Sequence, residues 1–247
     1  MKQTIRTVLM LGLLPLFSFV TTIETHMLEE TPVQIRLVTY GSNPESLVFL
    51  NLHENERTSV EAAKDFLESR SGTFVSVQQN GNRNIAFTLK NTAYVFDPNR
   101  MFTKTGRIRN LKMLNKNYSS AAEETVEEFS DKLISKFRQA SLVVALHNNT
   151  NGKPLSVHSY RVKYVVPGMD PDDFVLTTEK SIFERLKAKR VNAVLETTGT
   201  SIDDGSLAYY CSKKNLPYIN VEAQAGHQAE QLKMLKALDD IIELYAE

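Results

Sequence analysis

The sequence predicts a single α/β domain with a mostly parallel mixed β-sheet flanked by helices. Three apolar runs, at 47–52, 141–146 and 218–221, are typical of strands that are buried on both faces of a sheet. The segment 120–138 has apolar residues at helical spacing, and similar helical segments lie between the apolar runs. No internal repeat or interdomain linker divides the chain, so one domain is expected.

The elements can be assigned in chain order from periodicity and turn residues. Strands are expected at 34–40, 47–52, 74–78, 85–89, 93–96, 141–147, 191–195 and 218–222, and helices at 59–70, 120–138, 178–189, 203–213 and from about 227 onward. Thr58-x-x-Glu61 predicts a capping box at the start of the first helix. The basic segment 103–118 has no pattern and is expected to be a loop, while 157–166 fits either a hairpin or a covering flap.

Residues 1–22 have the layout of a secretory signal peptide. A basic head, Met1–Arg6, precedes an apolar run from Val8 to Val20, which is short for a membrane span. Cleavage near Thr22 would leave a domain of residues 23–247, periplasmic or secreted from a bacterial cell. The alternative is an uncleaved leader, which would be the only part of the chain to contact a membrane.

The composition argues against a nucleic-acid-binding protein and against a fold held by disulfides. The 29 basic and 29 acidic residues balance, and no basic stripe indicates a nucleic-acid partner. Cys211 is the only cysteine, so the chain forms no intramolecular disulfide. Export without disulfides suits a bacterial protein.

The three apolar runs end in His53, His147 and Glu222, and Glu56 follows three residues after His53. Parallel central strands bring their carboxyl ends to one edge of a sheet, where open α/β sheets place their ligands. Two histidines and one carboxylate are a common ligand set for catalytic zinc. The sequence therefore predicts one Zn²⁺ per chain, held by His53, Glu56 and His147.

Other residues are candidates for the remaining chemistry. Glu222 is expected to be the base that activates a metal-bound water and returns the proton to the leaving group. Arg83 would stabilise the oxyanion, and Asn99 with Arg100 would bind a carboxylate of the substrate. Structural alternatives stay open: Glu222 as a helix cap, Arg83 as the tip of a hairpin, and 97–100 as a plain turn with a surface arginine.

This ordered set of motifs resembles the zinc carboxypeptidases, whose clan also holds the succinylglutamate desuccinylase/aspartoacylase deacylases. His53-x-x-Glu56 and His147 look like the zinc ligands, and Asn99-Arg100 looks like the pair that binds the terminal carboxylate. Segment 201–203 looks like the specificity pocket, which would make Ile202 substrate-binding, and 218–222 looks like the strand with the catalytic glutamate. The resemblance covers the chain from about residue 34 to its end.

The resemblance has departures. The tyrosine that the family uses to bind substrate should precede residues 201–203, yet 194–198 reads Val-Leu-Glu-Thr-Thr. Residues 53–58 also look like the deacylase branch.

The resemblance thus implies an exported zinc-dependent hydrolase acting on an amide next to a carboxylate, in a peptide or a cell-wall peptide. The alternatives are an N-acyl amino acid deacylase, and a non-catalytic relative that binds zinc without turnover.

Overall fold

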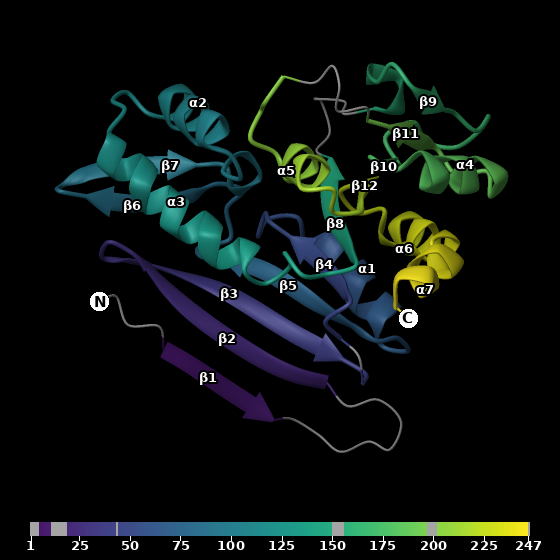
Figure 1. Ribbon diagram of the computed structural model, residues 1–247, viewed down its shortest axis with the longest axis horizontal. Coiled ribbons are helices and arrows are strands. Elements are labelled where there is room, and N and C mark those ends of the chain that lie inside the picture. The colour runs from purple at the N-terminus through teal and green to yellow at the C-terminus, as the bar shows by residue number, and fades with distance from the viewer. Residues whose placement is uncertain (1–4, 11–18, 43, 150–155, 197–201, 247) are drawn as a thin grey trace.

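The computed structural model describes residues 5–10, 19–42, 44–149, 156–196 and 202–246. In this part of the chain, ten strands form one sheet and two more form a separate hairpin (Figure 1). The order across the sheet is β1-β2-β3-β5-β4-β8-β12-β10-β11-β9, and the hairpin pairs β6 with β7.

The strands and helices have the following bounds. The strands are β1 Ile5–Met10, β2 Phe19–Leu28, β3 Thr31–Tyr40, β4 Leu47–Asn51, β5 Gly72–Gln78, β6 Ile85–Leu89, β7 Thr92–Phe96, β8 Leu142–Asn149, β9 Lys163–Tyr164, β10 Phe174–Thr177, β11 Ala193–Leu195 and β12 Tyr218–Gln224. The helices are α1 Arg57–Leu67, α2 Lys104–Leu114, α3 Ser120–Ile134, α4 Lys180–Ala188, α5 Leu207–Lys213, α6 Gln228–Ala237 and α7 Asp239–Ala246, with short 3₁₀ turns η1 Pro98–Arg100 and η2 Val157–Ser159.

The predicted α/β fold with a mixed sheet is confirmed. Strands β5, β4, β8 and β12 are parallel neighbours at the centre, and β10 is parallel to β11. The other pairings of the sheet's described strands are antiparallel, so parallel pairing is concentrated at the centre and does not extend over most of the sheet. The segment 157–166, which fitted a hairpin or a flap, contains η2 and the short edge strand β9.

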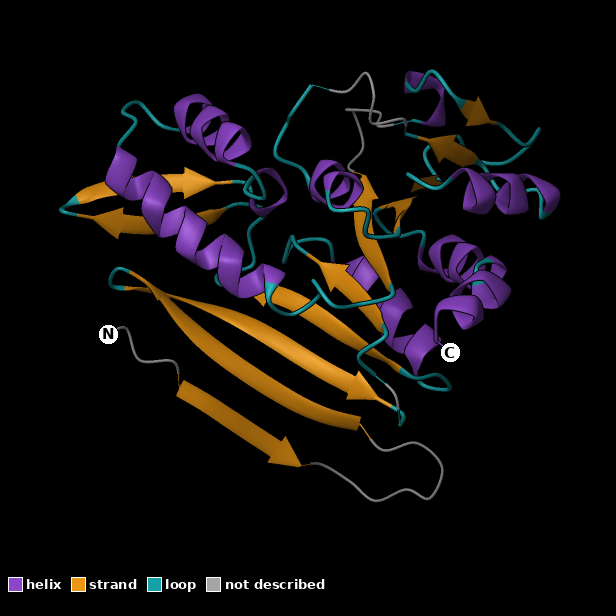
Figure 2. Ribbon diagram, viewed as in Figure 1, coloured by secondary structure: helices purple, strands orange, loops and turns teal. Residues whose placement is uncertain are grey.

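Helices cover both faces of the sheet (Figures 1 and 2). Along β4, Val48 and Leu50 belong to a core shared with α2, α3, α5 and the β6–β7 hairpin. Leu47 and Phe49 point the other way, into a core shared with α1, α4, α6 and α7. Successive side chains of a strand alternate between the faces, so a strand covered on both sides reads as a continuous apolar run.

The amino-terminal strands lie at one edge of the sheet. β1 pairs with β2 in an antiparallel manner, and β2 pairs with β3. Strand β2 is not predicted from the sequence, because the first residues of this strand belong to the segment interpreted as a signal peptide. Residues 19–23 of β2 contribute no buried side chain, and the first buried one is Glu24. Cleavage of residues 1–22 stays a prediction. None of the helices in the described ranges is long and apolar enough to cross a membrane.

Helix α2 shows that the loop predicted for 103–118 is wrong. The Thr103 hydroxyl accepts a hydrogen bond from the Gly106 amide and caps the helix. The helix buries Gly106, Arg107 and Leu111, and Arg107 donates to Glu123 of α3 at 2.6 Å. An ion pair therefore holds this helix in place, whereas most helices are held by a stripe of apolar side chains. Hydrophobic periodicity in the sequence does not detect such a helix.

The predicted capping box at Thr58 and Glu61 is also wrong. The residue at the N-cap of α1 is Glu56, and its side chain makes no capping hydrogen bond. The Thr58 hydroxyl accepts from the amide of Gly226, which precedes α6. Tertiary contacts thus take over the groups that a local capping motif would use.

The approach of Gly106 to Gly205 gives a test of this packing. A Cβ on Gly106 would lie 2.1 Å from the Cα of Gly205, whose φ of +75° itself favours glycine. Gly106→Ala should therefore lower the free energy of unfolding by about 1–3 kcal/mol, measured by urea denaturation. Gly81→Ala is the control, since Gly81 has a φ of +78° but no neighbour within 4 Å. Equal losses in both variants would contradict a steric role for Gly106.

Candidate active site

His147 and Glu222 lie side by side because strands β8 and β12 are parallel and pair them in register. Ala145 and Asn220 precede them by two residues on the same strands, and Ala145 faces the core shared with α3. With a side-chain period of two, His147 and Glu222 point to that same face. Both are more than nine-tenths buried. The predicted convergence of these two strands is therefore present.

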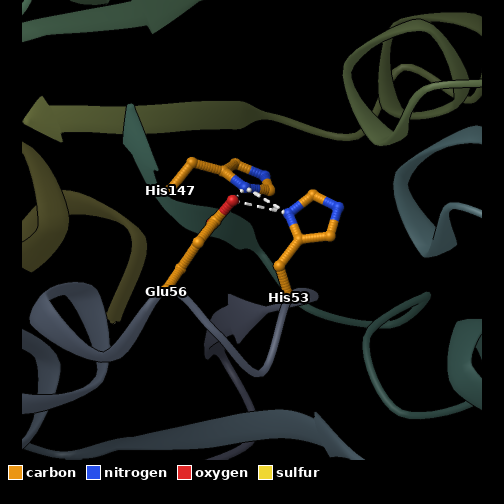
Figure 3. A group of neighbouring side chains, drawn as sticks. All are labelled: His53, Glu56 and His147. Atoms are coloured by element: carbon orange, nitrogen blue, oxygen red, sulfur yellow. Dashed lines mark hydrogen bonds and ion pairs between the residues drawn. The ribbon is translucent and has the colours of Figure 1, made fainter. Parts of the chain in front are cut away.

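His53 and Glu56 come from the turn between β4 and α1. The Glu56 amide donates to the His53 carbonyl at 3.0 Å, which closes the turn and brings the two side chains together. Strand β4 is parallel to β8, so this turn leaves the sheet beside His147. Figure 3 shows the three side chains directed at one point from these different elements.

The contacts within this group are short. His53 Nδ1 lies 2.9 Å from Glu56 Oε1, and His147 Nδ1 lies 2.9 Å from Glu56 Oε2. The two Nδ1 atoms are 3.2 Å apart. Each residue offers a ligand atom, and these atoms lie within 4.8 Å of one another. Three buried donors that face a common point are the arrangement expected of a metal site.

Asp97, just after β7, orients His53 from behind. His53 Nε2 donates to Asp97 Oδ1 at 2.8 Å, because a carboxylate can only accept. The proton on Nε2 leaves Nδ1 as the ligand atom, which is the role of an acidic partner behind a metal-binding histidine. The backbone amide of Asn99 also donates to Asp97 Oδ1, at 2.8 Å, and fixes the orientation of this carboxylate.

The charges in the cluster stabilise one another. Burial by itself lowers the pKa of His53, but the Glu56 charge and the hydrogen bond to Asp97 outweigh it and raise that pKa to about 9. Burial by itself raises the pKa of Glu56, yet the two histidines hold it well below its usual range. The pKa of Asp97 is likewise held low by His53 and Arg83, against the effect of burial.

The donor set fits zinc. Two imidazole nitrogens and a carboxylate match the ligands of catalytic zinc sites, which keep one position open. Ligands bind metals in their deprotonated form, so His53 Nδ1 and Glu56 Oε1, which lie 2.9 Å apart, would both face a bound cation. His53, Glu56 and His147 would hold the ion, with Asp97 behind His53.

A cavity of about 450 Å³ opens beside this cluster. Most of the predicted site residues line it, namely Glu56, Arg83, Asn99, Arg100, His147 and Glu222. His53 is fully buried behind them. Ile202 is 80% exposed and is not among the lining residues, so its role in a specificity pocket stays a prediction.

Arg83 and the 99–100 pair have definite contacts. Arg83 Nη1 donates to Glu56 Oε1 at 2.6 Å, and its Nη2 lies 3.5 Å from Asp97 Oδ2. The Asn99 side-chain oxygen accepts from the Leu207 amide at 3.0 Å, and its nitrogen lies 3.5 Å from His147 Nε2. Arg83 and Asn99 therefore border the His53–Glu56–His147 cluster and the cavity.

Glu222 is buried at the edge of the cavity, where Asn220 is its hydrogen-bond partner among the described residues. Asn220 Nδ2 donates to Glu222 Oε1 at 3.0 Å. Burial raises the pKa of Glu222, with the positive charge of His147 acting in the other direction. A carboxylate with a raised pKa is suited to take up and return a proton near neutral pH.

Sequence reasoning missed several of the described residues of this site. Asp97 and Asn220 hold His53 and Glu222, Tyr160 lines the cavity, and Gln231 donates to the backbone carbonyls of His147 and Val221 at 3.0 Å. For Asp97, its position two residues before Asn99 is the sequence feature that could have indicated a place in the site. Asn220 and Gln231 are recognised only once β8, β12 and α6 are assembled, and Tyr160 only once the segment after η2 is placed at the cavity.

Comparison with known proteins gives distant similarities in structure alone. No protein family model matches the sequence, and no curated protein matches it. The ectoine utilization protein EutE (DoeB) from Ruegeria pomeroyi is similar with 13% identity and a TM-score of 0.46, over 89% of this chain. The chain spans 65% of the length of EutE.

Two other solved structures are similar to the same extent. The murein-tripeptide amidase MpaA from Escherichia coli O157 has 16% identity and a TM-score of 0.43, over 86% of this chain and 87% of its own. An aspartoacylase family protein from Mesorhizobium loti has 13% identity and a TM-score of 0.41, over 91% and 67%. Because these TM-scores lie below 0.5, the function is inferred from this chain's own residues.

The metal site can be tested by measuring bound zinc after dialysis. Wild type should retain about one Zn²⁺ per chain and His147→Ala should retain none, because it loses one of three ligands. Asp97→Asn should bind zinc about 10–100-fold more weakly, since the amide no longer fixes the charge and tautomer of His53. Glu184→Gln, an exposed carboxylate on α4, is the control. Zinc bound equally by wild type and His147→Ala would contradict the assignment.

Proposed function

We propose that this chain is an exported zinc-dependent amide hydrolase of metallocarboxypeptidase type, acting on an amide next to a carboxylate in a peptide or cell-wall peptide. The observation that carries the proposal is the placement of Glu222 and Arg100 around one cavity with the His53–Glu56–His147 cluster. A metal site, a buried proton carrier and a cation for a carboxylate are what such a reaction needs.

The chain's own residues have distinct tasks in this proposal. Asn99 and Arg100 bind the substrate carboxylate and hold the adjacent amide at the cluster. Glu222 takes a proton from the attacking water and returns it to the leaving nitrogen. When bound, zinc polarises the amide carbonyl and makes water more acidic.

Arg83 is the donor for the oxyanion. Its guanidinium, half exposed, contacts Glu56 and Asp97 at the border of the cavity. Five N–H groups in a fixed fork allow it to keep one of these contacts while donating to a new negative oxygen. Tyr160 offers a second donor in the cavity, because burial raises the pKa of its phenol and keeps it protonated.

The role of Glu222 predicts a separation of turnover from metal binding. Glu222→Gln keeps the size of the side chain and its contact with Asn220, but it cannot accept a proton. It should retain zinc and lose at least about 10²-fold in kcat, as expected for removal of a general base. Zinc content and steady-state kinetics measure the two quantities. Unchanged kcat would exclude Glu222 as the base, whereas absence of turnover in the zinc-loaded wild type would favour a binding protein.

The second candidate is an N-acyl amino acid deacylase of the desuccinylase/aspartoacylase type. Residues 53–58, which look like the deacylase branch, favour it. In that case Arg100 would bind a carboxylate on the acyl part of the substrate.

Blocking one carboxylate at a time distinguishes the two hydrolases. For a peptidase, amidation of the peptide's terminal carboxylate should reduce kcat/KM by about 10–100-fold, because Arg100 loses its charged partner. For a deacylase, the same amidation should have little effect, while succinyl-type acyl groups should be preferred to acetyl. Equal rates on all of these substrates would contradict carboxylate recognition by Arg100.

A further inference from the structure

The segment 79–84, which carries Arg83, connects β5 to β6 and belongs to neither strand. In the described part of the chain, no hydrogen bond between backbone groups outside helices and strands involves this segment. Contacts with side chains must therefore hold it in place, and the position of Arg83 depends on them.

The carboxylate of Glu54 makes two of these contacts. Its Oε2 accepts from the backbone amide of Gln79 and from that of Gly81, each at 2.7 Å. Backbone amides that converge on one point form a concave site that binds anions. Hydrogen bonds to an ionised acceptor are roughly twice as strong as neutral ones. Glu54 therefore fixes the first half of the segment.

The side chain of Gln79 closes the segment into a loop. Its Nε2 donates to the Ala86 carbonyl at 2.6 Å, and its Oε1 accepts from the Ala86 amide at 2.9 Å. This pair of hydrogen bonds ties the start of the segment to strand β6 beyond it. The loop is thus closed on itself, and its contacts with Glu54 determine where it lies.

Glu54 belongs to the turn that supplies two of the predicted metal ligands. It lies between His53 and Glu56, and the hydrogen bond from the Glu56 amide to the His53 carbonyl closes this turn. Arg83 Nη1 donates to Glu56 Oε1 at 2.6 Å. Arg83 is therefore tied to one turn twice, by its backbone segment through Glu54 and by its guanidinium through Glu56.

Glu54 has no direct place in the site. It is neither a member of the His53–Glu56–His147 cluster nor among the described residues that line the cavity of about 450 Å³. Any effect of its carboxylate on the chemistry must therefore pass through the segment that it holds, which presents Arg83 to the cavity.

We propose that Glu54 is the positioning residue for Arg83. This rests on the proposed amide hydrolysis, in which Arg83 donates to the oxyanion. To do so, the guanidinium must give up one of its contacts with Glu56 and Asp97, and it is then held less firmly at its tip. The hydrogen bonds from Glu54 to the backbone persist through this exchange and keep the donor within reach of the negative oxygen.

The kinetic test removes or neutralises the carboxylate, with N-benzoylglycyl-phenylalanine as the substrate of the zinc-loaded protein. Glu54→Ala should lower kcat at least about tenfold and change KM less than about twofold, because a misplaced donor is lost mainly in the transition state. Glu54→Gln keeps an oxygen for both amides and should restore kcat to within about fivefold of wild type. Zinc content should not change in either variant. Glu61→Ala, which removes an exposed carboxylate on α1, is the control.

A double variant decides whether Glu54 acts through Arg83. Arg83→Ala alone should lower kcat by about 10²–10³-fold, as for removal of an oxyanion donor. Adding Glu54→Ala to it should cost less than about twofold more, because the group that Glu54 positions is already gone. Losses that multiply in the double variant, or an unchanged kcat in Glu54→Ala, overturn the proposal.

A structural measurement separates this inference from the proposed reaction. Hydrogen–deuterium exchange of the amides of 79–84 and modification of Arg83 by phenylglyoxal are both followed by mass spectrometry on the zinc-loaded protein. Both should be at least about fivefold faster in Glu54→Ala than in wild type, and close to wild type in Glu54→Gln and Glu61→Ala. If they are faster but the wild type does not cleave the dipeptide, the proposed hydrolysis fails and the positioning of Arg83 stands. An unchanged rate of either kind in Glu54→Ala overturns it.

Discussion

The parallel pairing of β4, β8 and β12 is the constraint on which the site depends. It places His147 opposite Glu222 in register and brings the turn that follows β4 to the same edge. No local motif could do this, because the three elements are separated by some tens of residues or more in the chain. A shift of register by one residue on β12 would turn Glu222 to the opposite face, where α6 packs.

The site also depends on groups that are used away from their ordinary local roles. Glu56 occupies the N-cap of α1, yet its carboxylate faces two histidines and an arginine instead of the helix amides. Ser59, in the first turn of this helix, donates its amide to the side-chain oxygen of Asn148 on β8. The helix start is therefore tied to the strand next to His147, which fixes Glu56 in the direction the cluster requires.

Electrostatic pairing organises the wall of the cavity as well. Arg100 is neutralised by Asp204, and the close contact of Gly106 with Gly205 brings that segment against α2. This ion pair fixes the orientation of the Arg100 guanidinium and balances its charge until a substrate carboxylate competes for it. Glu196 lies nearby; burial and the Asp204 charge raise its pKa, and the charge of Arg100 acts in the other direction.

The sequence by itself determined the buried strands and the residues that end them. Apolar runs that end in His53, His147 and Glu222 are sufficient to predict an α/β sheet and the residues that meet at its edge, because strands buried on both faces are recognisable from their local composition. Helix α2, strand β2 and the partners Asp97, Asn220 and Gln231 were decided by the tertiary structure. Their roles arise from pairing with residues far along the chain, such as Arg107 with Glu123 or Gln231 with the His147 carbonyl, and such contacts leave no period in the sequence. The local pattern of apolar residues indicates which faces of strands and helices are buried. The pairing of charged side chains and their orientation in the site follow only from the assembled fold.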